Sequence, residues 1–379
     1  MDLDPHQEPT TTRRHKCSAC YQQFKKKEHL VDHMRVSYHS IHEPKCGVCN
    51  KHCRTLASVR EHLTGPLPKR HCAEIFASRG CDLCLNILDS PNALRLHEEL
   101  CRLSPAYHGN MTMCIVENYA RAEMDVPSLS MGSNGNQDPE VVAMDCEMVG
   151  GGSDGSLDLC ARVCLIDENE NVIFHSYVKP IIPVTNFRFA FGNSFRFEIT
   201  GITEDHLVDG MSLLEVNKKI EKILYNGESI SRARLEGGKA SILVGHDLDH
   251  DLDCLKMNYP LHLIRDTAQY RPLKRTNDSV GFSLKYLTQT YLGYEIQNGT
   301  HDPYEDCVAA LRLYKRMRSQ IHQTEFLMSN ESNVTFHTRT INCFDPSRLK
   351  ELVKMSPDDL LSMSVADYRC WCLDRRQNS

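Results

Sequence analysis

The chain has little of what marks a membrane or secreted protein. No apolar run among its 379 residues approaches the roughly 20 residues needed to span a bilayer. Its beginning, Met1–His6, has no basic stretch followed by an apolar one, so we expect no secretory signal. With 41% hydrophobic and 25% charged residues and a mean hydropathy of -0.43, the composition predicts a soluble protein with a sizeable core.

Cysteine, by contrast, is abundant and unevenly distributed. Without secretion the 18 cysteines are not expected to form a disulfide framework, because reducing compartments keep thiols free. Metal sites and ordinary buried thiols remain as explanations. Residues 1–110 hold 9 of the 18 cysteines and 11 of the 19 histidines, with 16 Lys and Arg against 12 Asp and Glu. This density of cysteine and histidine indicates metal binding.

Changes in composition predict the domain boundaries. Residues 111–138 include a stretch of Gly, Ser and Asn without apolar periodicity, which is typical of a flexible linker. Over residues 139–320, apolar runs alternate with helical patterns, which favours an α/β domain. Residues 321–379 form a less informative tail, in which we expect one helix over Asp358–Ala366.

A cysteine–histidine pattern repeats three times within residues 1–110. In each copy Cys-x2-Cys is followed after twelve residues by histidine, a spacing that can close a tetrahedron around zinc. A unit of about 25 residues buries little apolar surface, so the metal supplies its folding energy. We therefore predict small ββα-type zinc fingers at about residues 17–39, 46–72 and 81–101. The predicted Zn²⁺ ligands are Cys17, Cys20, His33 and His39, then Cys46, Cys49, His62 and His71, then Cys81, Cys84, His97 and Cys101. Cys72 is the alternative to His71 as fourth ligand of the second finger.

The partner of the fingers is less well defined than their metal. Lys25, Lys26 and Lys27 open the expected helix of the first finger, where they are placed to meet phosphates. Such a charge run is also typical of a solvated helix face, and fingers also serve as protein-binding modules. We favour nucleic acid as the partner.

Acidic residues cluster at three places in the 139–320 domain. In the first cluster Asp145 and Glu147 close a predicted buried strand, and alternation places both side chains on the same face. In the second, the apolar strand Ile242–Gly245 runs into a helix. Asp251 lies beside the inward stripe of that helix, with Asp247 as the competing acid one turn earlier.

The third cluster opens a helix. Asp302 is a suitable N-cap and Pro303 suits the first helical position, which places Asp306 in the first turns and His301 just ahead. Taken singly, each cluster has an ordinary structural explanation as a cap, a loop histidine or a solvated face. Taken together, they provide four carboxylates, which two-metal phosphoryl chemistry requires, and a histidine that can take a proton from the attacking water.

This set of motifs resembles the DEDD exonucleases that carry a histidine in the third motif. Within them it is similar to the branch of RNA exonuclease 4 and the interferon-stimulated exonucleases. The matching residues, within 141–319, are Met144–Gly150, Val244–His246, Asp251–Leu252, His301 and Glu305–Asp306, with supporting stretches at Ile264–Thr267 and Ile296–Gln297. The three fingers ahead of the domain resemble plant members especially.

The resemblance implies a ribonuclease H-like fold, a mixed sheet flanked by helices. It implies Asp145, Glu147, Asp251 and Asp306 as ligands of two Mg²⁺ or Mn²⁺ ions, and His301 as general base. It further implies residence in the nucleus, including the nucleolus, and a role in ribosomal RNA processing.

Two features depart from the family pattern. About eight residues appear inserted after Phe187, where Arg188-Phe189 recurs as Arg196-Phe197, in a loop that lies near the substrate's terminal nucleotide in the family. Asp247 replaces a small residue, which leaves a second acid beside the expected site. Basic side chains either line the path of the strand or form a solvated surface: Arg265, Arg271, Lys274 and Arg275.

We accordingly predict a 3′-to-5′ exonuclease that hydrolyses phosphodiester bonds, with RNA favoured over DNA by resemblance alone. The alternatives are a DNA exonuclease in repair and a zinc-finger nucleic-acid-binding protein with a non-catalytic nuclease scaffold. In the tail, Cys370 and Cys372 flank the only tryptophan, Trp371, and are expected to form a packing patch or an end without order. The other cysteines outside the fingers, including Cys146 and Cys307, are expected to be small core residues without assigned chemistry.

Overall fold

The computed structural model describes residues 14–106, 140–187, 190–191, 194–195, 200–235, 237–276, 281–320, 322 and 344–375. In this part of the chain no helix combines the length and the apolar character that crossing a membrane requires. Contacts divide the chain into two compact units. The cysteine-rich unit comprises Met1–Glu98, Arg271–Gly281 and Met317–Arg375, and the sheet unit comprises Glu99–Tyr270, Phe282–Arg316 and Arg376–Ser379. The predicted linker over residues 111–138 lies outside the described residues.

The sheet unit is built on a mixed sheet, seven-stranded within the described residues, in the order β11-β10-β3-β4-β5-β9, with β6 also paired to β3. β3 pairs antiparallel with β4 and parallel with β10, and β10 pairs parallel with β11. The strands are β3 (Val141–Gly151), β4 (Leu157–Ile166), β5 (Val172–Lys179), β6 (Val184–Asn186), β9 (Met211–Ser212), β10 (Ile242–Gly245) and β11 (Ile264–Asp266). The α/β fold predicted from the sequence is confirmed.

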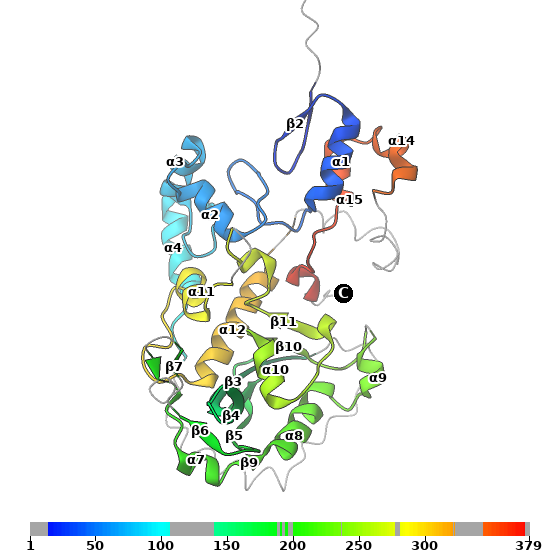
Figure 1. Cartoon of the computed structure of the whole chain (residues 1–379). Helices are drawn as coiled ribbons and strands as arrows, with labels where there is room; N and C mark the ends of the chain where they lie inside the picture. Colours follow the sequence, from blue (N-terminus) through cyan, green and yellow to red (C-terminus); the bar gives the residue numbers. More distant parts are fainter. Residues whose placement is uncertain are drawn as a thin grey trace, which may run out of the picture. The chain divides into compact units, whose positions relative to one another are not determined.

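Helices flank this sheet, as Figure 1 shows for α8, α10 and α12. The helix α8 begins with a capping box between Ser212 and Glu215 and contacts β5, while α10 contacts β3 and β4. Cys307 of α12 donates its thiol to the carbonyl of Cys164 in β4 at 3.4 Å. The helices of this unit are α7 (Glu204–Val208), α8 (Leu213–Tyr225), α9 (Ile230–Ala233), α10 (Leu248–Leu255), α11 (Leu284–Tyr291) and α12 (Pro303–Arg318).

The extra stretch predicted from the repeated Arg-Phe pair lies largely outside the described residues. Within it the backbone forms two short antiparallel strands, β7 (Ala190–Phe191) and β8 (Ser194–Phe195).

The cysteine-rich unit contains small antiparallel pairs, each followed by a helix. In the first, β1 (His15–Lys16) and β2 (Gln23–Phe24) precede α1 (Lys27–Ser37). The bridges Lys45 to His52 and Gly80 to Ile87 take the place of the strand pair in the second and third. The helices that follow are α2 (Leu56–Thr64), α3 (Arg70–Arg79) and α4 (Pro91–Cys101). This is the ββα pattern that the spacing predicts.

The tail packs against the first finger within the same unit. The expected helix forms as α15 (Pro357–Met363), with Ser356 as N-cap and Pro357 at the first helical position. Leu352, Leu360 and Leu361 join Leu30, Val31 and Met34 of α1 in one buried cluster, and Figure 1 shows α15 beside α1. The remaining elements of the tail are η4 (Pro346–Arg348), α14 (Leu349–Leu352) and η5 (Trp371–Asp374).

Candidate active site and cysteine–histidine clusters

Strand β3 carries the first two acids on one face. Asp145 pairs with Cys164 and Glu147 with Arg162, two positions apart on β4, so both carboxylates project from the same side of the sheet. The register shifts directly after Glu147, where a bulge interrupts the pairing before it resumes at Met148 and Cys160. Glu147 is buried, at 7% exposure, whereas Asp145 is partly exposed.

The end of β10 positions the helix that carries Asp251. A Cβ on Gly245 would lie 2.9 Å from the carbonyl oxygen of Met144, so glycine is needed where β10 meets β3. Asp247 follows in the left-handed region at φ 65°, a conformation that aspartate tolerates better than most residues. The Asp266 carboxylate accepts the backbone N–H groups of Asp247 at 2.9 Å and Leu248 at 3.2 Å, and so fixes the start of α10.

The start of α12 positions Asp306. Asp302 accepts the N–H of Tyr304 at 3.2 Å, as an N-cap does, and Arg162 lies 3.1 Å from the same carboxylate oxygen. One turn into the helix, Oδ2 of Asp306 accepts a hydrogen bond of 2.8 Å from the side-chain amide of Gln297.

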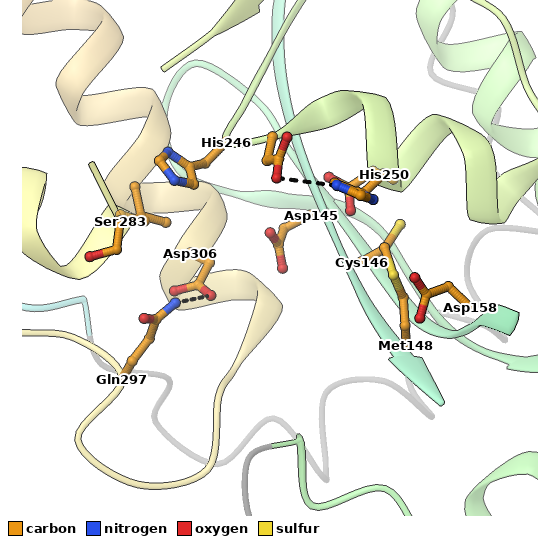
Figure 2. A pocket seen from close by; sticks show the side chains of 12 residues that line it. Asp145, Cys146, Met148, Asp158, His246, His250, Ser283, Gln297 and Asp306 are labelled. Atoms are coloured by element: carbon orange, nitrogen blue, oxygen red, sulfur yellow. Dashed lines mark hydrogen bonds and ion pairs between the residues drawn. The ribbon is translucent and has the colours of Figure 1, made fainter. Parts of the chain in front are cut away.

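Three of the four predicted acids, Asp145, Asp251 and Asp306, line one cavity of about 480 Å³. Figure 2 shows Asp145 and Asp306 in this cavity, with the bond from Gln297 drawn as a dashed line. The full lining is Asp145, Cys146, Met148, Asp158, His246, Asp247, His250, Asp251, Ser283, Leu284, Gln297 and Asp306.

Glu147 and His301 are absent from that lining. Glu147 is nevertheless close enough for its charge to raise the pKa of both Asp145 and Asp251. His301 is half-buried just ahead of α12, and burial together with the charge of Lys285 lowers its pKa. The imidazole is therefore neutral near pH 7, which is the form that can accept a proton.

The carboxylates repel one another and are poorly solvated. Burial, followed by the charges of Asp251, Asp306 and Glu147, raises the pKa of Asp145. Burial likewise raises the pKa of Asp251, and it raises that of Asp306 to about 7. Among the described residues, Oδ2 of Asp251 and Oδ1 of Asp306 are buried without a hydrogen-bond partner. Buried carboxylate oxygens without donors fit hard divalent cations, which prefer oxygen ligands.

Among the cavity residues that received no role from the sequence, His246 and Gln297 stand out by their contacts. His246 lines the cavity, its Nδ1 lies 2.9 Å from the hydroxyl of Thr267, and burial lowers its pKa to about 4. Gln297 binds Asp306. Both lie in stretches that carry the family resemblance, and this resemblance is the sequence signal that could have identified them as site residues. Asp247 lies beside the site as expected, whereas Arg265 is 3% exposed and bonds the carbonyls of His262 and Ile264, so it does not line a path for a strand.

The predicted zinc ligands gather in three clusters. In each cluster one potential ligand atom from every residue lies within 4.8 Å of the others. The cysteine sulfur to histidine nitrogen distances are 3.3 Å for Cys20 and His33, 3.4 Å for Cys49 and His62, and 3.2 Å for Cys84 and His97. The clusters are Cys17, Cys20, His33 and His39; Cys46, Cys49, His62 and Cys72; and Cys81, Cys84, His97 and Cys101.

The second cluster corrects the predicted ligand set, because it contains Cys72 in place of His71. The helix α3 begins at Arg70, and successive residues on a helix point about 100° apart. Cys72 is fully buried, whereas His71 is exposed. Because the Gly65–Pro68 segment intervenes, the sequence alone does not show which side chain of α3 faces the cluster.

The chemistry of these clusters fits zinc. Thiolate and imidazole are the ligands of structural zinc sites. In the first cluster Nδ1 of His39 lies 3.0 Å from the Glu43 carboxylate, while its Nε2 is buried without a hydrogen-bond partner among the described residues. A carboxylate that orients the second nitrogen of a ligating histidine is a common feature of zinc sites.

Comparison with known proteins agrees with the acidic site. Residues 142–314 match the exonuclease family RNase_T. RNA exonuclease 4 of Homo sapiens is 34% identical over 179 residues, which are 47% of this chain and 37% of that protein. RNA exonuclease 4 of Gibberella zeae is 36% identical over 178 residues, or 47% of this chain and 49% of that protein. This chain thus spans about half or less of the length of these two relatives.

Among solved structures, the catalytic unit of Neurospora crassa Pan2, with its protease and nuclease domains, is similar with a TM-score of 0.38. The match has 20% identity and covers 52% of this chain and 29% of that chain. The family match confirms the ribonuclease H-like fold expected for the sheet unit. Residues 142–314 are therefore an exonuclease domain, homologous over that region to the RNA exonuclease 4 proteins.

Proposed function

We propose that this protein is a 3′-to-5′ exoribonuclease that hydrolyses terminal phosphodiester bonds with the help of two divalent cations. The observation that carries the proposal is the convergence of Asp145, Asp251 and Asp306 from three elements on one cavity, with Glu147 beside them. The exonuclease family match and the relatives named RNA exonuclease 4 support the reaction class and the choice of RNA.

Asp145, Glu147, Asp251 and Asp306 are the residues that would hold Mg²⁺ or Mn²⁺. When bound, the two cations supply positive charge that polarises the phosphoryl group and steadies the leaving oxygen. The protein's own part is to fix the carboxylates. Gln297 holds Oδ2 of Asp306, while Oδ1 has no hydrogen-bond partner among the described residues, and Asp266 anchors the helix of Asp251.

His301 is our proposed general base. It takes a proton from the attacking water while the water oxygen bonds to phosphorus and the bond to the 3′ oxygen breaks. Its lowered pKa keeps it neutral, in the accepting form, at the start of the step. His246 lines the cavity and is also neutral, but its Nδ1 is engaged with Thr267, so we assign it a supporting role.

The test uses two labels on one oligoribonucleotide. With Mg²⁺ and a 3′-labelled strand, we expect release of labelled mononucleotide at the earliest times; a 5′-labelled strand should shorten progressively. Asp145→Asn should abolish both signals, whereas Asp253→Asn, which changes an exposed acid on α10, should not. An endonucleolytic ladder, or binding of the strand without cleavage, would contradict the proposal.

DNA exonuclease activity is the second candidate. Matched RNA and DNA strands in the same assay separate the two. The exposed Lys25 and Lys26 of the first finger support nucleic acid as the finger partner. We further propose residence in the nucleus and nucleolus, which imaging of the tagged full-length chain would test.

A further inference from the structure

A fourth cysteine–histidine cluster lies outside the three repeated units. It consists of His42, His322, Cys370 and Cys372, all of which belong to the cysteine-rich unit. One potential ligand atom from each residue lies within 4.8 Å of the other three. We propose that these four side chains bind a fourth structural Zn²⁺ ion, which ties the tail to the first two fingers.

The distances in this cluster are those of a tetrahedral zinc site. Zinc–sulfur bonds of about 2.3 Å and zinc–nitrogen bonds of about 2.0–2.1 Å at the tetrahedral angle place sulfur and nitrogen roughly 3.6 Å apart. The sulfur of Cys370 lies 3.5 Å from Nε2 of His322, and that of Cys372 lies 3.3 Å from Nδ1 of His42. The finger clusters show the same separations, 3.2 to 3.4 Å.

The orientation of the two rings agrees with this geometry. The imidazoles of His42 and His322 lie with centroids 4.8 Å apart and planes at 69°, edge to face rather than stacked. Two histidines that ligate one ion through ring nitrogens must approach it from different directions, as these do.

Three of the four side chains are almost fully withdrawn from water. His322, Cys370 and Cys372 are 6%, 3% and 2% exposed, and Trp371 between the cysteines is 4% exposed. None of the described cysteines forms a disulfide. A buried set of soft sulfur and imidazole nitrogen atoms favours zinc over Mg²⁺.

The position of His42 shows what the ion would do. It lies three residues after His39 and four before Cys46, between the ligands of the first and second fingers. The hydroxyl of Tyr368 donates to the His42 carbonyl at 2.9 Å, which holds the tail at this point. An ion here would close a loop of more than 300 residues in the unfolded chain, and long loops gain most from such a constraint.

Counting zinc by native mass spectrometry tests the inference. The full chain should carry four zinc ions, and C370S/C372S should carry three. C53S is the matched control, because Cys53 is a thiol of the same unit outside the four cysteine–histidine clusters described above, and it should keep four. Three ions in the unaltered chain, or an unchanged count in the double variant, would overturn the proposal.

Substitutions of a single proposed ligand test the site even if the double variant fails to fold. His322→Cys keeps a zinc ligand and should retain four ions, while His322→Ala should lose one. Because Trp371 is the only tryptophan and lies between two ligands, its fluorescence should change in His322→Ala and on chelation, but not in His322→Cys. Equal zinc counts for the two His322 variants would contradict the site. None of these readouts depends on nuclease activity.

Discussion

Asp306 combines two properties that rarely occur together in a side chain kept for stability alone. It is 5% exposed and its pKa is raised to about 7, yet one of its carboxylate oxygens has no hydrogen-bond partner among the described residues. Burying such a group costs free energy unless a cation offsets the charge. The residue therefore weakens the metal-free fold and suits a site that is completed by divalent ions.

Asp306→Asn should separate the contribution of Asp306 to catalysis from its effect on the stability of the metal-free fold. We expect exonuclease activity to fall by roughly 100-fold or more, since losing one ligand removes about 3 kcal/mol of charge stabilisation. The metal-free variant should be at least as stable as the unaltered protein at pH 8, because a buried charge has been removed. Thermal melts without and with Mg²⁺, beside the exposed control Asp253→Asn, check this. A variant that melts lower without metal and keeps its activity would contradict the assignment.

The raised pKa of Asp306 also predicts how pH acts on stability. Between its ordinary value near 4 and about 7, the folded protein binds a proton that the unfolded chain has already released. The metal-free sheet unit should therefore lose stability as pH rises through this window. Mg²⁺ competes with that proton, so its effect on Tm should be larger at pH 8 than at pH 5.5. Calorimetry in matched buffers measures both; an equal shift at the two pH values would argue against carboxylate ligands.

At the scale of elements, helix phase decides which side chains reach a site. In α3, the buried Cys72 directly follows the exposed His71, and only Cys72 joins the second cluster. Cys72→Ser should remove one zinc ion and unfold the second finger locally, whereas His71→Ala should leave zinc and stability unchanged. Zinc counting by mass spectrometry distinguishes the two, and loss of zinc in His71→Ala would restore the original ligand set.

The packing of α15 against α1 is likewise an element-scale feature. Leu360 is fully buried in a cluster that it shares with Leu30 of the first finger. Leu360→Ala should lower the unfolding free energy by about 2–5 kcal/mol through lost burial and a residual cavity. Val365→Ala, at a 40% exposed site just after α15, should cost far less. Chemical denaturation followed by Trp371 fluorescence reports on this unit. Equal effects of the two substitutions would show that the tail does not support the finger.

At the scale of the whole molecule, the acidic cavity and the fourth cysteine–histidine cluster belong to different units. The carboxylates lie in the sheet unit, whereas Trp371 lies in the cysteine-rich unit. Withdrawing Mg²⁺ at constant zinc should abolish hydrolysis without changing Trp371 fluorescence. A chelator selective for zinc should change that fluorescence while a short oligoribonucleotide is still degraded. If withdrawing Mg²⁺ alone abolished hydrolysis and also changed Trp371 fluorescence, both units would depend on the same metal.

The sequence by itself determined whatever depends on local spacing. The finger ligands other than His71 follow from counts along the chain, because a small zinc knuckle is closed by residues close in sequence. Strand alternation placed Asp145 and Glu147 on one face, and cap chemistry placed Asp302 at the start of α12. The family motifs then indicated a nuclease before any contact was known.

Only the tertiary structure decided what depends on long-range contacts. His42, His322, Cys370 and Cys372 span more than 300 positions, and no periodicity links them. The same holds for Leu360 against Leu30, and for His246 and Gln297 beside the acids. Cys370 and Cys372 were expected to form a packing patch or an end without order; the structure buries them, and it alone shows the two histidines beside them. Local spacing predicts zinc knuckles, strand faces and helix caps, because neighbouring backbone holds the groups that form them. A cluster whose members are distant in the sequence forms only through tertiary contacts.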